Sequence, residues 1–136
     1  MKSAALIAIV LNALLIAPSI AAAQAAGACP ANEMATIRIS KIAPGGTMAG
    51  FDKAVADHAK WYADHGFDKD RIFAAPMLVS DETTHKLAPS PDTMMSFHTH
   101  DHEVPKSMED AAWNAFVSEY RANSVIVGAT HVCLPE

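Results

Sequence analysis

The sequence predicts one α+β domain whose elements follow the order strand, helix, strand, strand, helix, strand. Apolar and polar residues alternate strictly over residues 36–42, which is typical of a strand with one buried face. Apolar residues then recur at intervals of three and four over residues 48–65, the period of an amphipathic helix. A second strand pattern and a second helix pattern precede the Val- and Ile-rich segment 124–134, so we expect two strand–helix–strand units.

The first strand and the first helix have clear end signals. The strand is expected to stop at Pro44 and the two glycines after it, and Thr47 is placed to cap a helix that begins at Met48. Gly66 is expected to end this helix at about His65, because glycine readily adopts the left-handed conformation found after helices. The apolar stripe of the helix consists of Phe51, Val55, His58 or Ala59, and Tyr62.

The middle of the chain predicts two further strands. Residues 71–79 are apolar and compact enough for one strand, and Pro76 indicates an edge position, where a missing N–H does no harm. Residues 80–91 are polar and rich in turn-forming residues, so we expect a loop there. Residues 93–100 predict the third strand.

The second helix is expected after Pro105. Ser107 would cap it, with Glu109 and Asp110 in the first turn, where acidic side chains favour the positive end of a helix. Its apolar stripe consists of Trp113, Phe116, Val117 and Tyr120. Residues 124–134 then form the fourth strand.

This order of elements implies a four-stranded antiparallel sheet with both helices on one face, the ferredoxin-like arrangement. With the chain's size and residues 58–66 (HAKWYADHG), it resembles the dimeric α/β-barrel superfamily. That superfamily includes cofactor-free monooxygenases, cyclases, mutarotases, haem-degrading enzymes and stress-response proteins. The resemblance implies a homodimer in which two open sheet faces close on each other, with a small-molecule pocket in each protomer.

Residues 1–23 predict a secretory signal peptide, because Lys2 precedes a short apolar stretch that ends in small residues. We therefore expect an exported protein, in a bacterial periplasm or secreted, without a permanent membrane span. Residues 24–35 would form an N-terminal lead and residues 36–136 the domain. The net charge of −5 argues against nucleic acid as a partner.

The chain contains two cysteines, one near each end of the mature protein. In an oxidising compartment such a pair favours a disulfide. Cys29 precedes the first strand and Cys133 ends the fourth, and these strands are expected to lie side by side, so a Cys29–Cys133 bond fits the topology. The alternative is a lipid anchor on Cys29, because Ala26 to Ala28 loosely match the small-residue box of bacterial lipoproteins.

Histidines alternate at positions 98, 100 and 102, so in an extended strand their side chains share one side. The topology is expected to bring two more histidines to this end of the sheet, while His58 and His85 stand apart. The predicted cluster consists of His65, His98, His100, His102 and His131.

The orientation of each strand decides whether these side chains face the helices or the interior of the barrel. We expect an apolar set to pack under the helices, namely Ile37, Ile39, Met95 and Phe97. The alternate residues would then face into the barrel, namely Arg38, Ser40, Ser96, His98 and His100. Apolar walls with a few convergent polar groups are typical of a ligand pocket; the alternative is a water-filled dimer seam.

A metal site is the first function that the histidines suggest. His98, His100 and His102, with Glu103 or His65, could bind Zn²⁺ or Cu²⁺. Strand spacing opposes this, since alternate residues lie nearly 7 Å apart along the backbone.

Acid–base chemistry without a cofactor is the second function and the one we favour. His98 or His100 would act as the base and Arg38 would hold an anion. Side chains expected to contact the ligand are Ser40, Trp61, Tyr62, His65, Ser96 and His131. In the resembling family, His and Tyr serve in this way in cyclases and mutarotases.

Two further functions remain open at this point. Haem binding would use His65 or His131 as the axial ligand. The other is a structural or stress-response role without chemistry.

Overall fold

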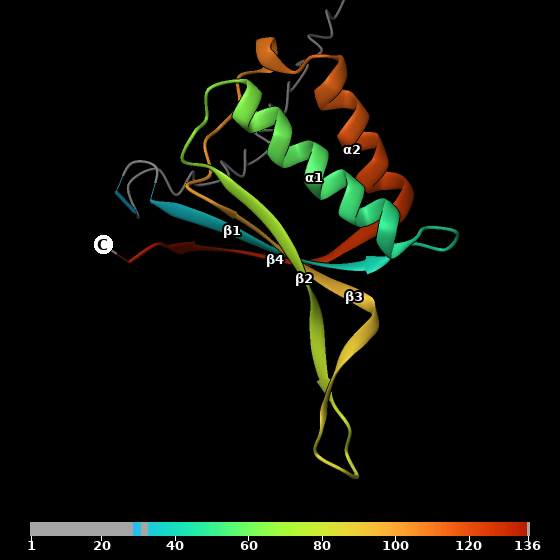
Figure 1. Ribbon diagram of the computed structural model, residues 1–136. Helices are drawn as coiled ribbons and strands as arrows, with labels where there is room; N and C mark the ends of the chain where they lie inside the picture. Colours follow the sequence, from blue (N-terminus) through green and yellow to red (C-terminus); the bar gives the residue numbers. More distant parts are fainter. Residues whose placement is uncertain (1–28, 31–32, 136) are drawn as a thin grey trace, which may run out of the picture.

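The computed structural model describes residues 29–30 and 33–135, so the predicted signal peptide lies outside the described residues. The fold is ferredoxin-like, as predicted: a four-stranded antiparallel sheet in the order β2-β3-β1-β4, with both helices on one face (Figure 1). The elements are β1 (Met34–Ile42), α1 (Met48–Asp64), β2 (Arg71–Ser80), β3 (Leu87–Thr99), the 3₁₀ helix η1 (Lys106–Met108), α2 (Ala111–Asn123) and β4 (Ser124–Cys133).

The ends of α1 confirm the sequence signals, whereas the start of α2 corrects one. The Thr47 hydroxyl accepts a hydrogen bond from the Gly50 N–H at 2.9 Å, and Gly66 follows the helix with φ of 83°. Ser107 lies in the separate turn η1 and does not cap α2. Asp110 is the cap, because its carboxylate accepts from the Trp113 N–H at 2.8 Å.

The predicted loop 80–91 is partly strand. β3 begins at Leu87 and pairs with the second half of β2, so that the two strands form an arm that projects beyond the sheet (Figure 1). Pro89 and Pro91 argued against a strand in the sequence, because proline lacks the N–H that a strand donates. In the structure Pro89 nevertheless pairs with Leu78 in the arm. β2 is an edge strand, as Pro76 indicated.

The two faces of the sheet are the reverse of the prediction. Phe97 stacks on Phe73 at a centroid distance of 4.9 Å, and Phe73 is 48% exposed on the face that no helix covers. Met94, one residue out of phase with that set, packs with Phe51 of α1 in the core. The apolar set Ile37, Ile39, Met95 and Phe97 therefore faces outward, and Arg38, Ser40, Ser96 and His98 face the helices.

The disulfide is confirmed. Cys29 and Cys133 are bonded across a Cα–Cα distance of 5.3 Å. A sulfur in this bond cannot also carry a thioether-linked lipid, so the cysteine pair favours the disulfide over the lipid-anchor alternative. Within the described residues, no helix is long and apolar enough to cross a membrane.

Candidate functional site

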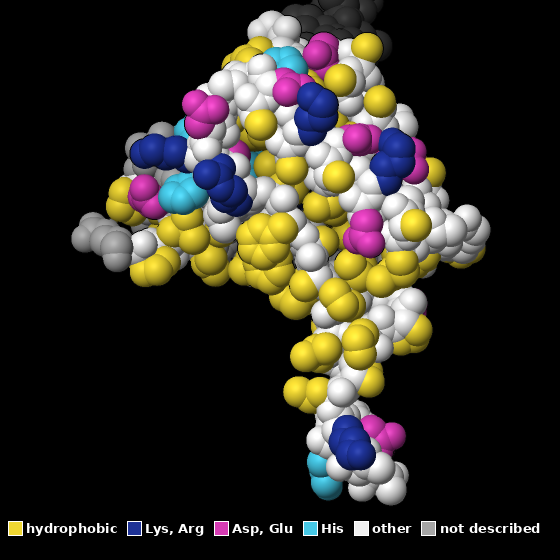
Figure 2. All heavy atoms as spheres, in the orientation of Figure 1, with side chains coloured by type: hydrophobic (Ala, Val, Ile, Leu, Met, Phe, Trp, Pro, Cys, Tyr) yellow, Lys and Arg dark blue, Asp and Glu magenta, His cyan; other side chains and the backbone are white. Residues whose placement is uncertain are grey.

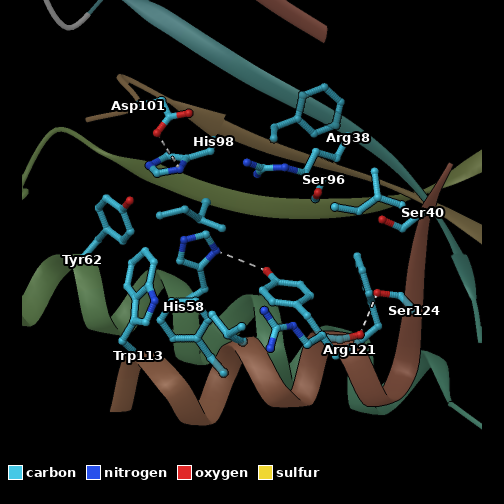
Figure 3. Close-up of a pocket in the computed structure, with 17 residues that line it drawn as sticks. Arg38, Ser40, His58, Tyr62, Ser96, His98, Asp101, Trp113, Arg121 and Ser124 are labelled. Atoms are coloured by element: carbon cyan, nitrogen blue, oxygen red, sulfur yellow. Dashed lines mark hydrogen bonds and ion pairs between the residues drawn. The ribbon is translucent and has the colours of Figure 1, made fainter. Parts of the chain in front are cut away.

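A cavity of about 440 Å³ lies between the helices and the sheet (Figure 3). A volume of this size is typical of small-molecule sites. Its walls are largely aromatic and aliphatic, and its polar groups come from both layers. The polar and aromatic lining consists of Arg38, Ser40, Phe51, His58, Tyr62, Ser96, Phe97, His98, Asp101, Trp113, Phe116, Tyr120, Arg121 and Ser124.

Five of the predicted site residues line this cavity: Arg38, Ser40, Tyr62, Ser96 and His98. They do so from inside one protomer, because the strands present this face to the helices rather than to a second sheet. The cavity is thus complete within the described part of a single chain.

The other predicted contacts lie elsewhere. Trp61 is buried in the core and donates from its indole nitrogen to Asp110 at 3.0 Å. His65 stacks on Trp61 at 3.9 Å, outside the cavity lining. His131 lies on exposed β4 with its Nδ1 2.9 Å from the Thr36 hydroxyl. Neither His65 nor His131, the two residues expected to ligate haem, is among the residues that line the cavity.

The three alternating histidines do not share one side. β3 ends at Thr99, and His100 adopts a left-handed conformation with φ of 56° that turns the chain. His98 and His102 then meet at Asp70, while Nδ1 of His100 lies 3.6 Å from the Glu33 carboxylate. The sequence prediction assumed an extended strand through His102. The strand ends at Thr99, and the turn at His100 sends the three side chains in different directions.

The same geometry does not fit the proposed metal site. Among the described residues, no group of three His, Cys, Asp or Glu side chains is arranged to hold a metal ion. The nitrogens that would ligate are directed at carboxylates instead: Nε2 of His98 lies 2.7 Å from Asp70 Oδ1, and Nδ1 of His102 lies 2.7 Å from Asp70 Oδ2.

Both ring nitrogens of His98 lie close to carboxylates. Its Nε2 contacts Asp70 and its Nδ1 lies 3.2 Å from Asp101 Oδ1. His98 thus contacts Asp101, which lines the cavity, and its role as the base stays a prediction.

His58 is the residue that the sequence prediction missed. It projects from α1 into the cavity, stacks on Phe116 at 4.6 Å, and its Nδ1 lies 3.4 Å from the Tyr120 hydroxyl (Figure 3). Burial, reinforced by the charges of His98 and Arg38, lowers the pKa of His58 to about 3. The ring is therefore neutral at pH 7. The position of His58 in the apolar stripe of the first helix was the sequence signal that it faces the interior.

Two arginines face the cavity from opposite layers. Figure 3 shows Arg38 on the sheet and Arg121 on α2, with the cavity between them. Within the described residues, neither guanidinium has a carboxylate at ion-pair distance or a hydrogen-bond acceptor. Burial raises the pKa of Tyr62 and of Tyr120, so both phenols remain protonated donors.

No protein-family model matches the sequence, and no curated protein sequence matches it. Among solved structures, the chain is similar to SnoaB, a cofactor-independent oxygenase from Streptomyces nogalater, with 12% identity and a TM-score of 0.42. The match covers 76% of this chain and 93% of that one. A likeness this distant shows nothing about the activity of this chain.

Proposed function

We propose that this protein is an exported member of the dimeric α/β-barrel superfamily that binds a small, planar anion in the cavity. The observation that carries this proposal is Arg38, a partly buried cation that faces the cavity without a carboxylate partner in the described chain. A guanidinium in such surroundings is stabilised by an anion that completes its hydrogen bonds. The Cys29–Cys133 bond supports export, because disulfides persist in oxidising compartments.

The walls favour a flat ring as the body of the ligand. Tyr62, Trp113 and Phe116 supply aromatic surface, and Ser40 and Ser96 supply hydroxyls near Arg38. Aromatic rings pack well on such surfaces, and a few placed polar groups fix the orientation of the ligand. An aromatic carboxylate or phenolate satisfies both requirements.

A second proposal concerns catalysis without a cofactor. His58 is neutral and faces the cavity, so one of its ring nitrogens can take a proton from an acidic C–H or O–H of the ligand. Arg38 then pairs with the oxyanion that this transfer leaves. The positive charge of Arg38 lowers the pKa of His58, so an anion bound at Arg38 raises that pKa and makes His58 a better base.

The anion proposal is tested with 4-nitrophenol, whose phenolate is coloured and whose phenol is not. We expect the wild type to bind the phenolate form in preference, and Arg38→Met to weaken binding by about tenfold or more, because a charge-assisted hydrogen bond is lost. Absorption and tryptophan fluorescence titrations measure the two dissociation constants.

Lys53→Met is the matched control, since Lys53 is an exposed cation on α1 that pairs with Asp57 outside the cavity. It should bind 4-nitrophenol as the wild type does. Equal affinity of Arg38→Met and wild type for the phenolate would exclude the anion site.

We also propose that the open sheet face binds a second copy of the chain. Phe73, Val125 and Val132 are exposed on strands of this sheet, and the arm exposes Leu78 and Leu87. Figure 2 shows hydrophobic side chains gathered along the lower side of the sheet and down the arm. Monomeric proteins rarely expose apolar patches that are this continuous.

Phe73→Lys is expected to dissociate the dimer, raising its dissociation constant by about tenfold or more, because a charge replaces a ring at the interface. Analytical ultracentrifugation over a concentration series measures this constant. Ala63→Lys, on the exposed side of α1, adds the same charge away from the sheet and should leave the dimer intact. A wild type that stays monomeric throughout the series contradicts the proposal.

A further inference from the structure

Asp70 is a carboxylate enclosed between two histidines. Its side chain is fully buried, its Oδ1 lies 2.7 Å from Nε2 of His98, and its Oδ2 lies 2.7 Å from Nδ1 of His102. The His102 N–H also donates to Oδ1 at 3.4 Å. A buried carboxylate is retained only when it is paired and hydrogen-bonded, so this arrangement holds both imidazole rings in fixed positions.

The two histidines connect different environments. His98 lines the cavity, and its Nδ1 lies 3.2 Å from the carboxylate of Asp101, which lines the cavity too. The side chain of His102 is 26% exposed, whereas that of His98 is 4% exposed. Direct contacts between ionisable groups therefore run without interruption from the cavity wall to solvent.

We propose that Asp101, His98, Asp70 and His102 form a proton path between the cavity and solvent, with Asp70 as its central positioning residue. This inference deepens the proposed function and rests on it, because the path gives the ligand's oxyanion a proton source distinct from His58. Asp101 and His98 both line the cavity; Asp101 is the member that donates to the ligand, and the other three act through it.

Each transfer along the path moves one proton and no electrons. A solvent proton binds His102 at Nε2, and His102 releases its Nδ1 proton to Asp70. Asp70 passes a proton to Nε2 of His98, which releases its Nδ1 proton to Asp101, and Asp101 donates to the oxyanion. One proton enters and one leaves, and transfer in the opposite direction restores the starting tautomers.

Other ionisable groups lie close to these rings. His58 and Tyr62, both from α1, pack edge-on against the His98 ring at centroid distances of 5.4 Å and 4.6 Å, and Arg38 lies on the same face of the sheet. A side branch also exists, because the Thr36 hydroxyl contacts both the Asp101 carboxylate and, at 2.9 Å, Nδ1 of the exposed His131.

The path is tested first without a ligand, by NMR of the histidine side chains in the full protein. The exchange rate of the His98 ring N–H proton with solvent should fall by about tenfold in His102→Gln, which keeps Asp70 and removes only the group that takes up the solvent proton. Added imidazole buffer should restore the rate, since a small carrier replaces the missing group. A structural role for His102 would give no such rescue.

His131→Gln tests the side branch in the same way and should leave this rate unchanged. Asp64→Asn, an exposed carboxylate on α1 that pairs with Lys60, is the control for loss of a surface charge. An unchanged rate in His102→Gln, or a slower rate in His131→Gln alone, would overturn the path through Asp70.

The second measurement uses bound 4-nitrophenolate and a rapid drop in pH. Its colour should fade about tenfold more slowly in Asp70→Asn and in His102→Gln than in wild type, at equal affinity. Failure of 4-nitrophenol to bind would count against the proposed function alone, because the proton exchange of His98 still decides the path. Binding with equal fading rates in all three proteins would overturn the path.

Discussion

Replacing both Cys29 and Cys133 by serine is expected to lower the free energy of unfolding by about 4 to 5 kcal/mol. The bond joins residues 104 positions apart, so it removes much of the conformational freedom of the unfolded chain. It also ties the chain before β1 to the end of β4, two strands that pair along their length. Chemical denaturation, followed by the intrinsic fluorescence of the tryptophans, measures the loss.

Reduction of the wild type with dithiothreitol is the matched control, because it breaks the same bond without changing the sequence. It should reproduce the loss seen in the double variant and have no effect on that variant. The intact mass of the untreated protein should be lower by two hydrogens than that of the reduced form. Equal stability of wild type and double variant under oxidising conditions would show that the bond does not form.

The second large effect is acid sensitivity caused by His58. The folded protein keeps this ring neutral because its pKa is lowered to about 3, whereas the unfolded chain protonates it below its ordinary value of 6.5. Protonation therefore favours the unfolded state, and stability is lost as the pH falls from 6.5 toward 3. At pH 5 the loss attributable to His58 is about 2 kcal/mol.

His58→Phe removes the titrating group and keeps a ring to stack on Phe116. Between pH 7 and pH 5 this variant should lose about 2 kcal/mol less stability than the wild type does. His85→Asn is the control, since His85 is exposed, and Asn tolerates its positive φ of 54°. Parallel pH profiles for wild type and His58→Phe would mean that His58 is not desolvated.

Much of the fold could be predicted because its signals are local. The alternation over 36–42, the cap at Thr47 and the stop at Gly66 each depend on neighbouring residues, and each was found where predicted. One error arose where two local signals competed. Ser107 and Asp110 both suit a helix N-terminus, and only the chain's turn at η1 selects Asp110.

Less of the site could be predicted. Period two separates Arg38 from Ile39 but does not say which set faces the helices. The helices enclose a cavity lined by the polar set, whereas the apolar set lies on the face that no helix covers. Neither His58 nor Asp70 belongs to a regularly spaced set of histidines or carboxylates in the sequence, so no motif marked them as site residues. They reach His98 only because α1 crosses the sheet and the chain re-enters β2 beside the end of β3.

The sequence by itself determined the order of the elements and the ferredoxin-like topology, because periodicity, caps and chain order are encoded along the chain. Tertiary structure decided which face of the sheet holds the cavity, which histidine is desolvated there, and that Asp70 joins His98 to His102. Burial and electrostatic coupling depend on distances between side chains, and those distances are set only when the layers pack.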